Sequence, residues 1–389
     1  METIAYTLEL TLLCWASFTT FYLLFYALLS YFYHEDRRSI SEAQRLPHIL
    51  ILIPAYREDR VIFETAREAL KQHYPQQFFQ VAVVGDHLED KTISKLQKLP
   101  LRVLDVQFDK STKAKAINYA LEVLPGHYDL VLILDADNIM RYDFLKQLVQ
   151  GHHRNFQVMQ GQRIAKNRDS EIAELDALSE MVNNRIFCFG QQTIGLSSRL
   201  LGSGMCFNYS IFKRIMRNIE AIGGFDKELE IQLLKEKLEI HFLPRAIVYD
   251  EKTRVSNHLI GQRTRWISAQ YHYFKSHFLK NLKNPASLSN MDFTNKLLQL
   301  SLLPRSILLL FAMISSTFAL LFSHYDILLC WGICLSLLVF VYLMFIPIRE
   351  ISYHLNVALR HAPRIFLSLF MVIPKMKSVN KNFIHTPHQ

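Results

Sequence analysis

Two aspartates one residue apart close an apolar run, and their spacing poses a chemical question. The stretch VLILDADN (131–138) brings Asp135 and Asp137 to the end of Val131–Leu134. Turn residues that cap a strand explain either aspartate alone. Paired carboxylates are also suitable ligands for Mg²⁺ or Mn²⁺, hard cations that often share one or two carboxylates with substrate phosphates. The spacing therefore predicts a capped strand end or a metal site at Asp135 and Asp137.

Polar residues also follow two earlier apolar runs. Tyr56 and Glu58 come directly after His48–Pro54, and Asp86 follows Gln80–Val84. Short apolar runs are typical of strands buried on both faces of a parallel sheet. Ligands of such sheets bind beyond the carboxyl ends of the strands, so we expect these side chains to share one rim with the two aspartates. Strand capping explains any one of these residues, but explains the set poorly.

The elements that must position this rim alternate along the chain. Strands are predicted at 48–54, 80–84, 101–106 and 130–134, with helices at 58–73, 90–99 and 111–124. This order predicts an α/β domain with a mostly parallel, Rossmann-like sheet. The stretch 109–116 lacks the glycines of a P-loop, and 83–87 lacks the G-x-G-x-x-G pattern of a dinucleotide-binding turn. A bound phosphate would therefore be held by a metal and basic side chains.

Three long uncharged runs flank this domain: Leu10–Tyr33, Ser306–Ser323 and Ile327–Ile348. A helix of about 20 apolar residues crosses a bilayer core. The first run lacks a cleavage site and is predicted to be an anchor. Lys or Arg follows the first run, precedes the second and follows the third, but the link between the last two has none, so the positive-inside rule places residues 34–305 and the tail in the cytoplasm. We expect an integral protein of the plasma or inner membrane.

The composition agrees with a membrane protein. Of the 389 residues, 50% are hydrophobic, and the formal net charge is +9. A basic balance suits an anionic membrane surface or nucleic acid. The basic residues form no concentrated basic helix, so no nucleic-acid partner is expected. The five cysteines are scattered and indicate neither a zinc site nor a disulfide framework.

Six short motifs, taken together, resemble a known family. They are IPAYRE (53–58), TKAKAIN (112–118), LDADN (134–138), GSGMCF (202–207), FDKELE (225–230) and GQRTRW (261–266). Their order and the flanking apolar runs resemble the membrane-embedded family-2 inverting glycosyltransferases of GT-A fold. This branch contains cellulose, chitin and hyaluronan synthases and ceramide glucosyltransferases. The resemblance covers residues 48–275 and the anchors, and rests on the order of all six motifs, which include D-x-D and Q-x-x-R-W.

The resemblance assigns roles position by position. It implies metal binding by Asp137 and Asp135, and a general base at Asp226. The Q-x-x-R-W motif would place Gln262, Arg265 and Trp266 beside the diphosphate and the acceptor sugar, as further catalytic residues. It implies nucleotide-sugar binding by Ala55, Tyr56, Glu58, Asp86, Lys113 and Asp135. It implies acceptor contacts by Trp266, Gly202, Ser203 and Gly204.

The chemistry of these side chains agrees with such roles. An inverting transfer needs a base for the proton of the attacking hydroxyl, and Asp226 can supply it. Positive charge on the departing diphosphate can come from the metal, Arg265 and Lys113. Trp266 offers a flat apolar face on which a sugar ring can stack. Without the resemblance, Asp226 would be interpreted as a helix cap after Gly223 and Gly224.

Three positions depart from the family pattern. Gly85, Thr112 and Phe225 stand where the family has aspartate, glycine and glutamate. If Asp226 is not the base, Glu228 is the alternative. These departures keep a second hypothesis open, a non-catalytic membrane subunit or sensor that binds a nucleotide sugar. Release of UDP from a donor would separate the two hypotheses.

The resulting prediction is a membrane-bound, metal-dependent transferase that moves a sugar from a UDP-linked donor to a glycan or lipid acceptor with a β-linkage. Polysaccharide or glycolipid synthesis for the cell envelope is the expected setting, with an oligomer or a secretion partner as further candidates. Amphipathic helices at Gln270–Asn284 and Ile365–Pro374 are expected in the membrane interface. The expected divisions are an anchor at 1–35, a GT-A domain at 46–268, interfacial helices at 269–304, a transmembrane hairpin at 305–348 and a tail at 349–389.

Overall fold

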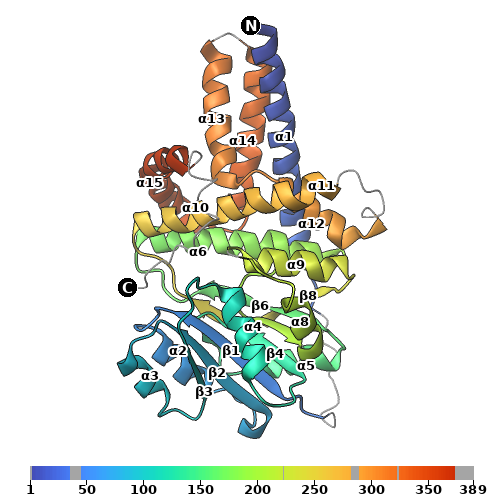
Figure 1. The fold of residues 1–389 in the computed structure, drawn as a ribbon. Coiled ribbons are helices and arrows are strands. Elements are labelled where there is room, and N and C mark those ends of the chain that lie inside the picture. The colour runs from blue at the N-terminus through green and yellow to red at the C-terminus, as the bar shows by residue number, and fades with distance from the viewer. Residues whose placement is uncertain (1, 36–44, 222, 282–288, 322–323, 373–389) are drawn as a thin grey trace.

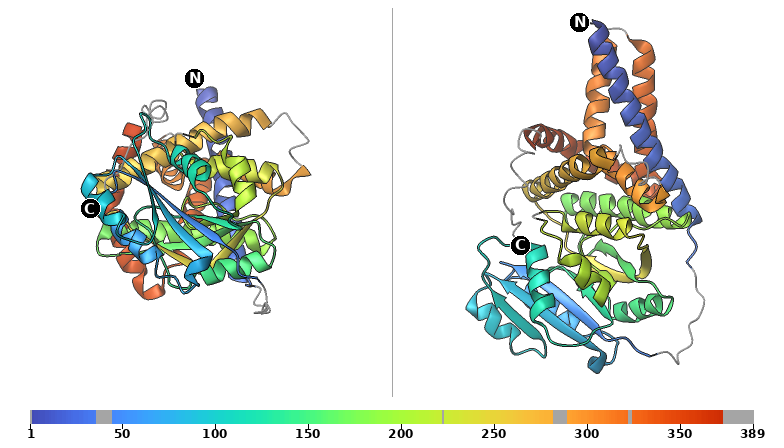
Figure 2. Two further views of the ribbon diagram at one scale, coloured as in Figure 1. Left: turned by 60° about the horizontal axis from the view of Figure 1, so that its bottom comes forward. Right: turned by 45° about the vertical axis from the view of Figure 1, so that its right-hand side comes forward.

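A computed structural model describes residues 2–35, 45–221, 223–281, 289–321 and 324–372. A domain built on a β-sheet forms one end of the molecule, a layer of helices covers it, and a column of three long helices stands on that layer (Figures 1 and 2). The layer contains α6 (Glu171–Asn184), α9 (Phe225–Lys235) and α10 (Ser256–Tyr273). The column contains α1 (Glu2–Leu29), α13 (Arg305–Leu321) and α14 (Tyr325–Leu343).

The sheet has eight strands in the order β3-β2-β1-β4-β7-β6-β8-β5. The strands are β1 (Ile49–Tyr56), β2 (Phe79–Asp86), β3 (Arg102–Val106), β4 (Leu130–Ile133), β5 (Ile139–Met140), β6 (Val158–Ala165), β7 (Met205–Asn208) and β8 (Ile240–Asp250). The four strands expected from the sequence are parallel to one another, as predicted. In the other half, β6 and β8 are parallel, but β7 is antiparallel to β4 and β6, and β5 is antiparallel to β8. The whole sheet is therefore mixed.

Strand β1 shows why its sequence is apolar without interruption. Leu50 and Leu52 pack into the core on one face of the sheet, and Ile49, Ile51 and Ile53 pack into the core on the other. All five side chains are fully buried. Successive side chains of a strand point to opposite faces, so a strand covered on both sides has no polar position.

Helices cover both faces of this sheet. The helices α2 (Ile62–Ala69), α3 (Asp90–Leu96) and α5 (Phe144–His153) bury their apolar sides in one core, and α4 (Lys113–Val123), α8 (Tyr209–Met216) and α9 bury theirs in the other. The helix expected at 58–73 is shorter in the structure. The amides of Val61 and Ile62 both donate to the carbonyl of Glu58, which leaves Tyr56 as the last residue of β1 and Glu58 in the loop that follows.

The helical column packs on the layer through a third apolar core. This core joins Leu23 of α1, Val182 of α6, Leu308 of α13 and Trp331 of α14. The backbone of α1 approaches Gly190, the last residue of the π-helix η3 (Arg185–Gly190), so closely that a Cβ there would lie 2.1 Å from the Tyr26 carbonyl oxygen. Only glycine fits this contact, which fixes α1 against the domain.

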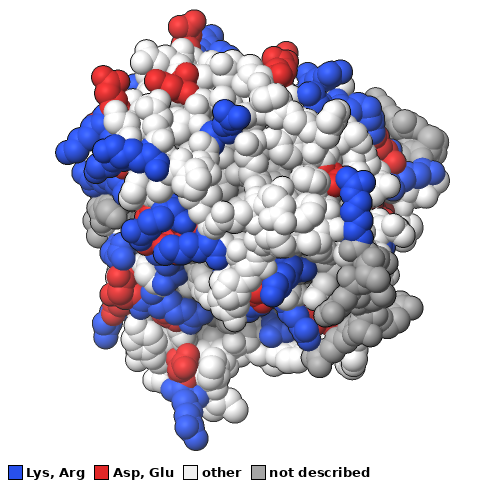
Figure 3. All heavy atoms as spheres, turned by 90° about the horizontal axis from the view of Figure 1, so that it is seen from below, with Lys and Arg blue, Asp and Glu red and all other residues white. Residues whose placement is uncertain are grey.

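Within the described residues, two helices are long and apolar enough to cross a membrane, at Tyr6–Phe32 and Tyr325–Leu343. The third expected span falls on α13, whose apolar part Ile307–Leu321 is shorter. Length and composition are weak evidence for a span, so the number of spans stays a prediction. The face of the molecule seen from below, opposite the column, carries basic and acidic side chains around a centre of uncharged residues (Figure 3).

The segments expected at the membrane interface are helical where they are described. The first falls on the end of α10, on η4 (Phe274–Phe278) and on α11 (Leu279–Asn281), and 282–284 lie outside the described residues. Helix α12 (Met291–Ser301) buries Phe293 in the same core as Leu229 of α9. The second segment falls on α15 (Ile351–Val372), and 373–374 lie outside the described residues. Their contact with a membrane interface stays a prediction.

Candidate active site

The ends of β1, β2 and β4 meet at one cavity, as the sequence predicts. The cavity has a volume of about 870 Å³. Its wall includes each residue expected to bind the nucleotide sugar or the metal: Ala55, Tyr56, Glu58, Asp86, Lys113, Asp135 and Asp137. The parallel strands deliver their carboxyl ends to the same edge, so segments far apart in the chain share this wall.

Asp86 is held firmly at the end of β2. Its carboxylate oxygen Oδ1 lies 2.6 Å from Nδ1 of His87 and accepts a hydrogen bond of 3.2 Å from the Phe108 amide. Only 2% of the residue is exposed. The His87 ring in turn makes an edge contact with the Tyr56 ring, with 5.7 Å between the centroids. This pair fixes the wall on which the sequence predicts a nucleoside.

Asp135 sits at the centre of a compact hydrogen-bonded turn. Its carboxylate accepts a hydrogen bond from Nζ of Lys113, which also donates to the Gly202 carbonyl at 2.7 Å. Its amide donates to the Ser203 hydroxyl at 2.9 Å. Lys113 is the first residue of α4, and Thr112 caps this helix by accepting from the Lys115 amide. Thr112, which replaces the glycine of the family pattern, therefore still gives α4 a defined start.

The expected acceptor residues divide into two groups. Trp266 and Gly202 line the cavity, whereas Ser203 and Gly204 are buried and do not. The Ser203 hydroxyl instead supports Asp135. Gly204 has φ of +64°, and a Cβ there would lie 2.9 Å from a methyl group of Val248. These two residues position the Asp135 turn and offer no surface to an acceptor.

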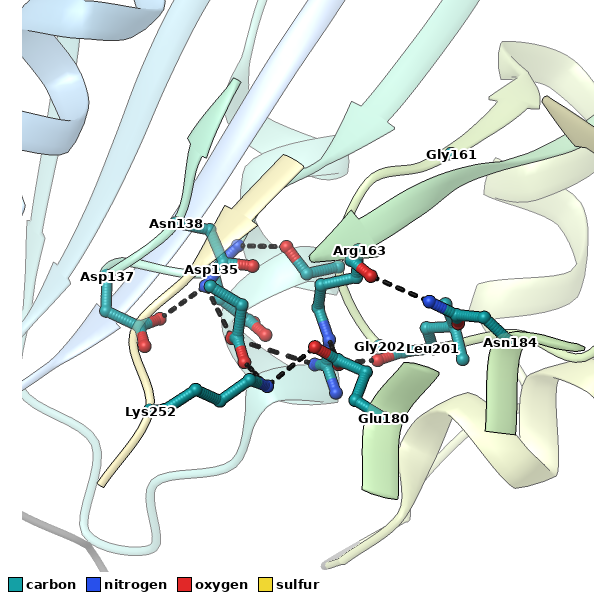
Figure 4. A network of polar contacts seen from close by, with 12 residues as sticks. Asp135, Asp137, Asn138, Gly161, Arg163, Glu180, Asn184, Leu201, Gly202 and Lys252 are labelled. Atoms are coloured by element: carbon teal, nitrogen blue, oxygen red, sulfur yellow. Dashed lines mark hydrogen bonds and ion pairs between the residues drawn. The ribbon is translucent and has the colours of Figure 1, made fainter. Parts of the chain in front are cut away.

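Asp137 lies at the edge of a buried polar network (Figure 4). The Asn138 amide nitrogen donates to Asp137 at 3.0 Å and to Asp250 at 2.9 Å. Burial raises the pKa of Asp137 well above its usual value, and the charges of Asp250 and Asp135 raise it further. A bound divalent cation would reverse this effect and keep the carboxylate ionised.

The rest of the network consists of paired charges. Lys252 lies 2.7 Å from Glu180 and 2.5 Å from Asp250, and Arg163 lies 2.5 Å from Glu180. Figure 4 shows the side chains of Lys252, Arg163 and Glu180 converging beside Asp135. Burial would raise the pKa of Asp250, but the charges of Arg163 and Lys252 lower it far below its usual value. The network therefore holds Asp250 ionised and orients Asn138 toward Asp137.

The described residues contain no group of three or more His, Cys, Asp or Glu side chains placed to hold a metal by themselves. Asp135 and Asp137 nevertheless fit a hard divalent cation that takes its other ligands from water and a diphosphate. The accumulation of Asp135, Asp137 and Asp250 within electrostatic range supports this fit, since a cation there would relieve the repulsion that raises the pKa of Asp137.

Asp226 lies across the cavity, in the first turn of α9. The N-cap of this helix is Gly224, with φ of +65°, so the structure assigns the cap position to Gly224 and not to Asp226. Burial would raise the pKa of Asp226, but the nearby charges of Lys227, Arg199, Lys296 and Lys113 lower it. The carboxylate is thus ionised and able to accept a proton. Glu228, the alternative base, accepts hydrogen bonds from Gln232 and His277 and is not part of the cavity wall.

Phe225 replaces the glutamate of the family pattern and has its own contact. Its ring is buried in the domain core, and the ammonium nitrogen of Lys113 lies 5.1 Å from the ring centroid. A cation over an aromatic face is stabilised by the ring quadrupole. Phe225 therefore helps to position Lys113, a contact that a sequence pattern alone does not show.

Helix α10 brings Gln262, Arg265 and Trp266 to the cavity wall. The carbonyl oxygen Oε1 of Gln262 is buried and has no hydrogen-bond partner among the described residues. Trp266 is 37% exposed, and the Arg263 guanidinium lies 4.8 Å from its ring. The Trp266 face is therefore available to a ligand, whereas Tyr273 on the same helix is buried in the core.

The cavity extends from the strand ends to the helical column. Beyond α10, its wall is formed by apolar side chains of α13, α14 and the segment before α13, together with Leu355 and Ala358 of α15. The residues from α13 and α14 are Leu309, Leu338, Val339, Tyr342 and Leu343. One continuous space thus joins the predicted donor site to an apolar region at the base of the column.

The arrangement of acidic strand ends on a mixed α/β sheet, with an ionised aspartate across the cavity, is that of the GT-A fold. Residues 47–269 match the family described as Glycosyltransferase like family 2, and the chain belongs to this family.

Individual relatives agree with this assignment. The chain is 25% identical over 239 residues to the probable glycosyltransferase YdaM of Bacillus subtilis, covering 57% of this chain and 55% of that protein. It is also 25% identical over 253 residues to a beta-monoglucosyldiacylglycerol synthase of Trichormus variabilis, covering 61% and 52%. The chain therefore spans only about half the length of these curated relatives.

A solved structure shows the same fold. The mannosyltransferase PcManGT from Pyrobaculum calidifontis, in complex with GDP-Man and Mn²⁺, superposes with a TM-score of 0.58. The superposition covers 94% of this chain and 97% of that one, at 16% sequence identity. This likeness includes the helical column as well as the sheet domain, because nearly the whole of each chain is matched.

Proposed function

We propose that this protein is a membrane-embedded inverting glycosyltransferase that moves a sugar from a nucleotide sugar, with UDP the expected nucleotide, to an acceptor carried by a lipid. The observation that carries the proposal is the continuous cavity from Asp86 and Asp135 to the apolar wall of α13 and α14. A soluble acceptor would not require an apolar end. The presence of a beta-monoglucosyldiacylglycerol synthase among the relatives supports a lipid acceptor.

The reaction follows from the positions of the charged groups. The ionised Asp226 takes the proton from the acceptor hydroxyl as the oxygen attacks the anomeric carbon of the sugar. The bond from that carbon to the diphosphate breaks, and the configuration inverts, which gives a β-linkage from an α-linked donor. Lys113 and Arg265 stabilise the charge on the departing diphosphate. Trp266 offers its exposed ring face to the acceptor.

Asp135 and Asp137 would hold a divalent cation, Mg²⁺ or Mn²⁺, beside the diphosphate. When bound, this cation would neutralise part of the diphosphate charge and make it a better leaving group. Neighbouring side chains orient both carboxylates before a cation binds. Lys113 and Ser203 fix the turn of Asp135, and Asn138 orients Asp137.

The surface of the helical column supports its insertion in a membrane. Large apolar side chains point outward from α1, α13 and α14, among them Phe21 at 60%, Phe318 at 54% and Leu329 at 65% exposure. Soluble proteins rarely expose apolar surface over such a length of helix. The cavity lies at the base of the column, so the catalytic domain would lie at the membrane surface. The positive-inside rule would place this domain on the cytoplasmic side.

Release of UDP tests the proposal. The full chain, purified in detergent or nanodiscs, is given UDP-glucose, UDP-N-acetylglucosamine, UDP-galactose or UDP-glucuronate with a membrane lipid extract, and with Mn²⁺ or EDTA. We expect metal-dependent UDP release with one donor and a labelled product that partitions with lipid. Binding of UDP without release from any donor would instead favour a non-catalytic subunit or sensor.

A further inference from the structure

Three cations line the cavity between Asp226 and the helical column. Lys227 is next to Asp226 on α9, Arg199 lies in the segment before β7, and Arg305 begins α13. Arg199 interacts electrostatically with both of the other two, so the three form a connected group. Among the described residues, no carboxylate oxygen lies within 4.0 Å of a side-chain nitrogen of any of the three.

Neighbouring buried charges behave differently. Lys296 lies 2.6 Å from Glu230, and Arg263 lies 2.7 Å from Asp176. These pairs satisfy the rule that a buried charge needs a counter-charge, because an uncompensated one is strongly unfavourable. Lys227, Arg199 and Arg305 form no such close pair: Asp226 and Glu230 act on Lys227 only at longer range, and Arg199 and Arg305 are half-buried at the cavity wall. This excess of positive charge on one wall indicates that a ligand supplies further negative charge.

Arg305 gives the most direct indication. Its nitrogen Nη2 donates to the Asn183 side chain at 2.7 Å and to the carbonyl and hydroxyl oxygens of Ser179 at 3.2 Å. These neutral contacts, and the Tyr342 ring 4.9 Å from the guanidinium carbon, fix the orientation of the side chain. The other nitrogen, Nη1, is buried and has no hydrogen-bond partner among the described residues. The guanidinium is therefore held in place while the N–H groups of Nη1 have no acceptor.

Arg199, Lys227 and Arg305 lie between the polar part of the cavity wall and its apolar part. Arg305 borders the cavity wall formed by Leu309, Leu338 and Leu343, and Lys227 borders the site of proton transfer. A ligand that satisfies both ends must carry negative charge near Asp226 and apolar chains near the column. Guanidinium groups suit phosphate oxygens, because their donors form a planar fork.

We infer that Arg199, Lys227 and Arg305 bind the phosphate of an anionic lipid headgroup, and that the acceptor is a lipid carrying a phosphate monoester or diester. This inference rests on the proposed function and narrows its acceptor class. The phosphate would occupy the wall beside Asp226, with its acyl or isoprenoid chains against α13 and α14. A neutral lipid would leave Nη1 of Arg305 without an acceptor and would add no negative charge beside the three cations.

Lipid retention by the full-length protein in a neutral detergent tests the inference. Dioleoylphosphatidic acid, dioleoylphosphatidylglycerol and dioleoylglycerol share the same chains and differ in the headgroup. Native mass spectrometry measures how much of each lipid stays bound, and UDP binding is measured on the same sample. We expect both phosphate lipids to be retained at least about tenfold more strongly than the neutral lipid.

Variants connect this preference to the three residues. Arg199→Gln and Arg305→Gln are each expected to lower retention of the phosphate lipids about tenfold and leave the neutral lipid unchanged. Arg305→Lys keeps the charge and should retain most of the preference even if Arg305→Gln folds poorly. Arg214→Gln is the matched control, since Arg214 pairs with Glu236 on the surface and is not part of the cavity wall.

Each remaining outcome has a definite meaning. Equal retention of neutral and phosphate lipids overturns the headgroup site, whatever UDP release shows. Equal loss of all lipids in Arg199→Gln also overturns it, because the effect would then not depend on charge. If free inorganic phosphate competes as well as the lipids, the lipid part of the inference fails. Selective retention without UDP release from any donor would leave the headgroup site standing and contradict the proposed function.

Discussion

The two ends of the cavity differ in how their charges are compensated. At the strand ends, Asp86, Asp135 and Asp250 each accept hydrogen bonds from neighbouring side chains or amides. On the side of the helical column, Arg199 and Arg305 have no carboxylate partner in the described structure. The strand ends are therefore organised before a ligand binds, whereas the column side has positive charge that a ligand can neutralise. This contrast matches a fixed donor site facing a site that an anionic substrate completes.

The two ends also differ in how the fold produces them. The donor end gathers the carboxyl ends of neighbouring parallel strands, so its geometry follows from the sheet. The column end gathers a loop, the start of α9 and the start of α13, which no single sheet or helix aligns. The predictions below test each end separately, from the largest expected effect to the smallest.

Loss of the proposed base should have the largest effect. Asp226→Asn keeps the shape of the side chain but cannot accept the proton, so we expect turnover to fall by about a thousandfold. Binding of UDP with Mn²⁺ should stay unchanged, because the donor end is intact. The measurement is UDP release in the presence of lipid extract. Glu228→Gln serves as the comparison, and a greater loss in that variant would transfer the role of base to Glu228.

Loss of the proposed metal ligand Asp137 should affect the donor end alone. Asp137→Asn removes a negative charge from the group that includes Asp135 and Asp250, and turnover should fall by about a hundredfold or more. Titration with Mn²⁺ should show weaker activation, while retention of phosphate lipids stays normal. The exposed Asp105→Asn on β3 is the control. Full turnover in Asp137→Asn would exclude this aspartate from the mechanism.

The buried network should contribute mainly to stability. Lys252 is 3% exposed and pairs with both Glu180 and Asp250, so Lys252→Met leaves two buried carboxylates short of positive charge. We expect a loss of about 3 kcal/mol, seen as a lower apparent Tm in detergent. Lys166→Met removes a surface pair with Glu64 at 4.0 Å and should change stability by about 0.5 kcal/mol or less. Similar shifts in the two variants would contradict a structural role for the network.

The sequence predicts the donor end better than the column end, and the reason is physical. The aspartates at 135 and 137 follow a buried strand, and local pattern identifies such a strand from its own residues. The direction of β7 and β5 depends on pairing with distant strands, which local pattern does not contain. The sequence therefore indicates the parallel half of the sheet but not the mixed half.

The same limit applies to the charged residues. Arg163, Glu180 and Lys252 pair across three elements, and nothing in the local sequence of any one of them indicates its partners. Arg199 and Arg305 are similar, since their lack of a counter-charge is visible only once the whole cavity wall is assembled. The stretch VYDEKT (248–253) contains Asp250 and Lys252, but polar residues at a strand end are equally consistent with a solvated turn.

A change of pH gives the smallest expected effect and tests the column end alone. The pKa of Lys227 is lowered to about 8, mainly by burial and also by the charges of Arg199 and Lys296, while Asp226 and Glu230 oppose the shift. The ammonium charge is therefore complete well below pH 8 and is lost as the pH rises through that value. The charge of phosphatidylglycerol is constant in this range, so its retention should fall about threefold between about pH 7 and pH 9. Lys227→Arg stays charged and should abolish this decline, and an equal decline in both proteins would remove Lys227 from the headgroup site.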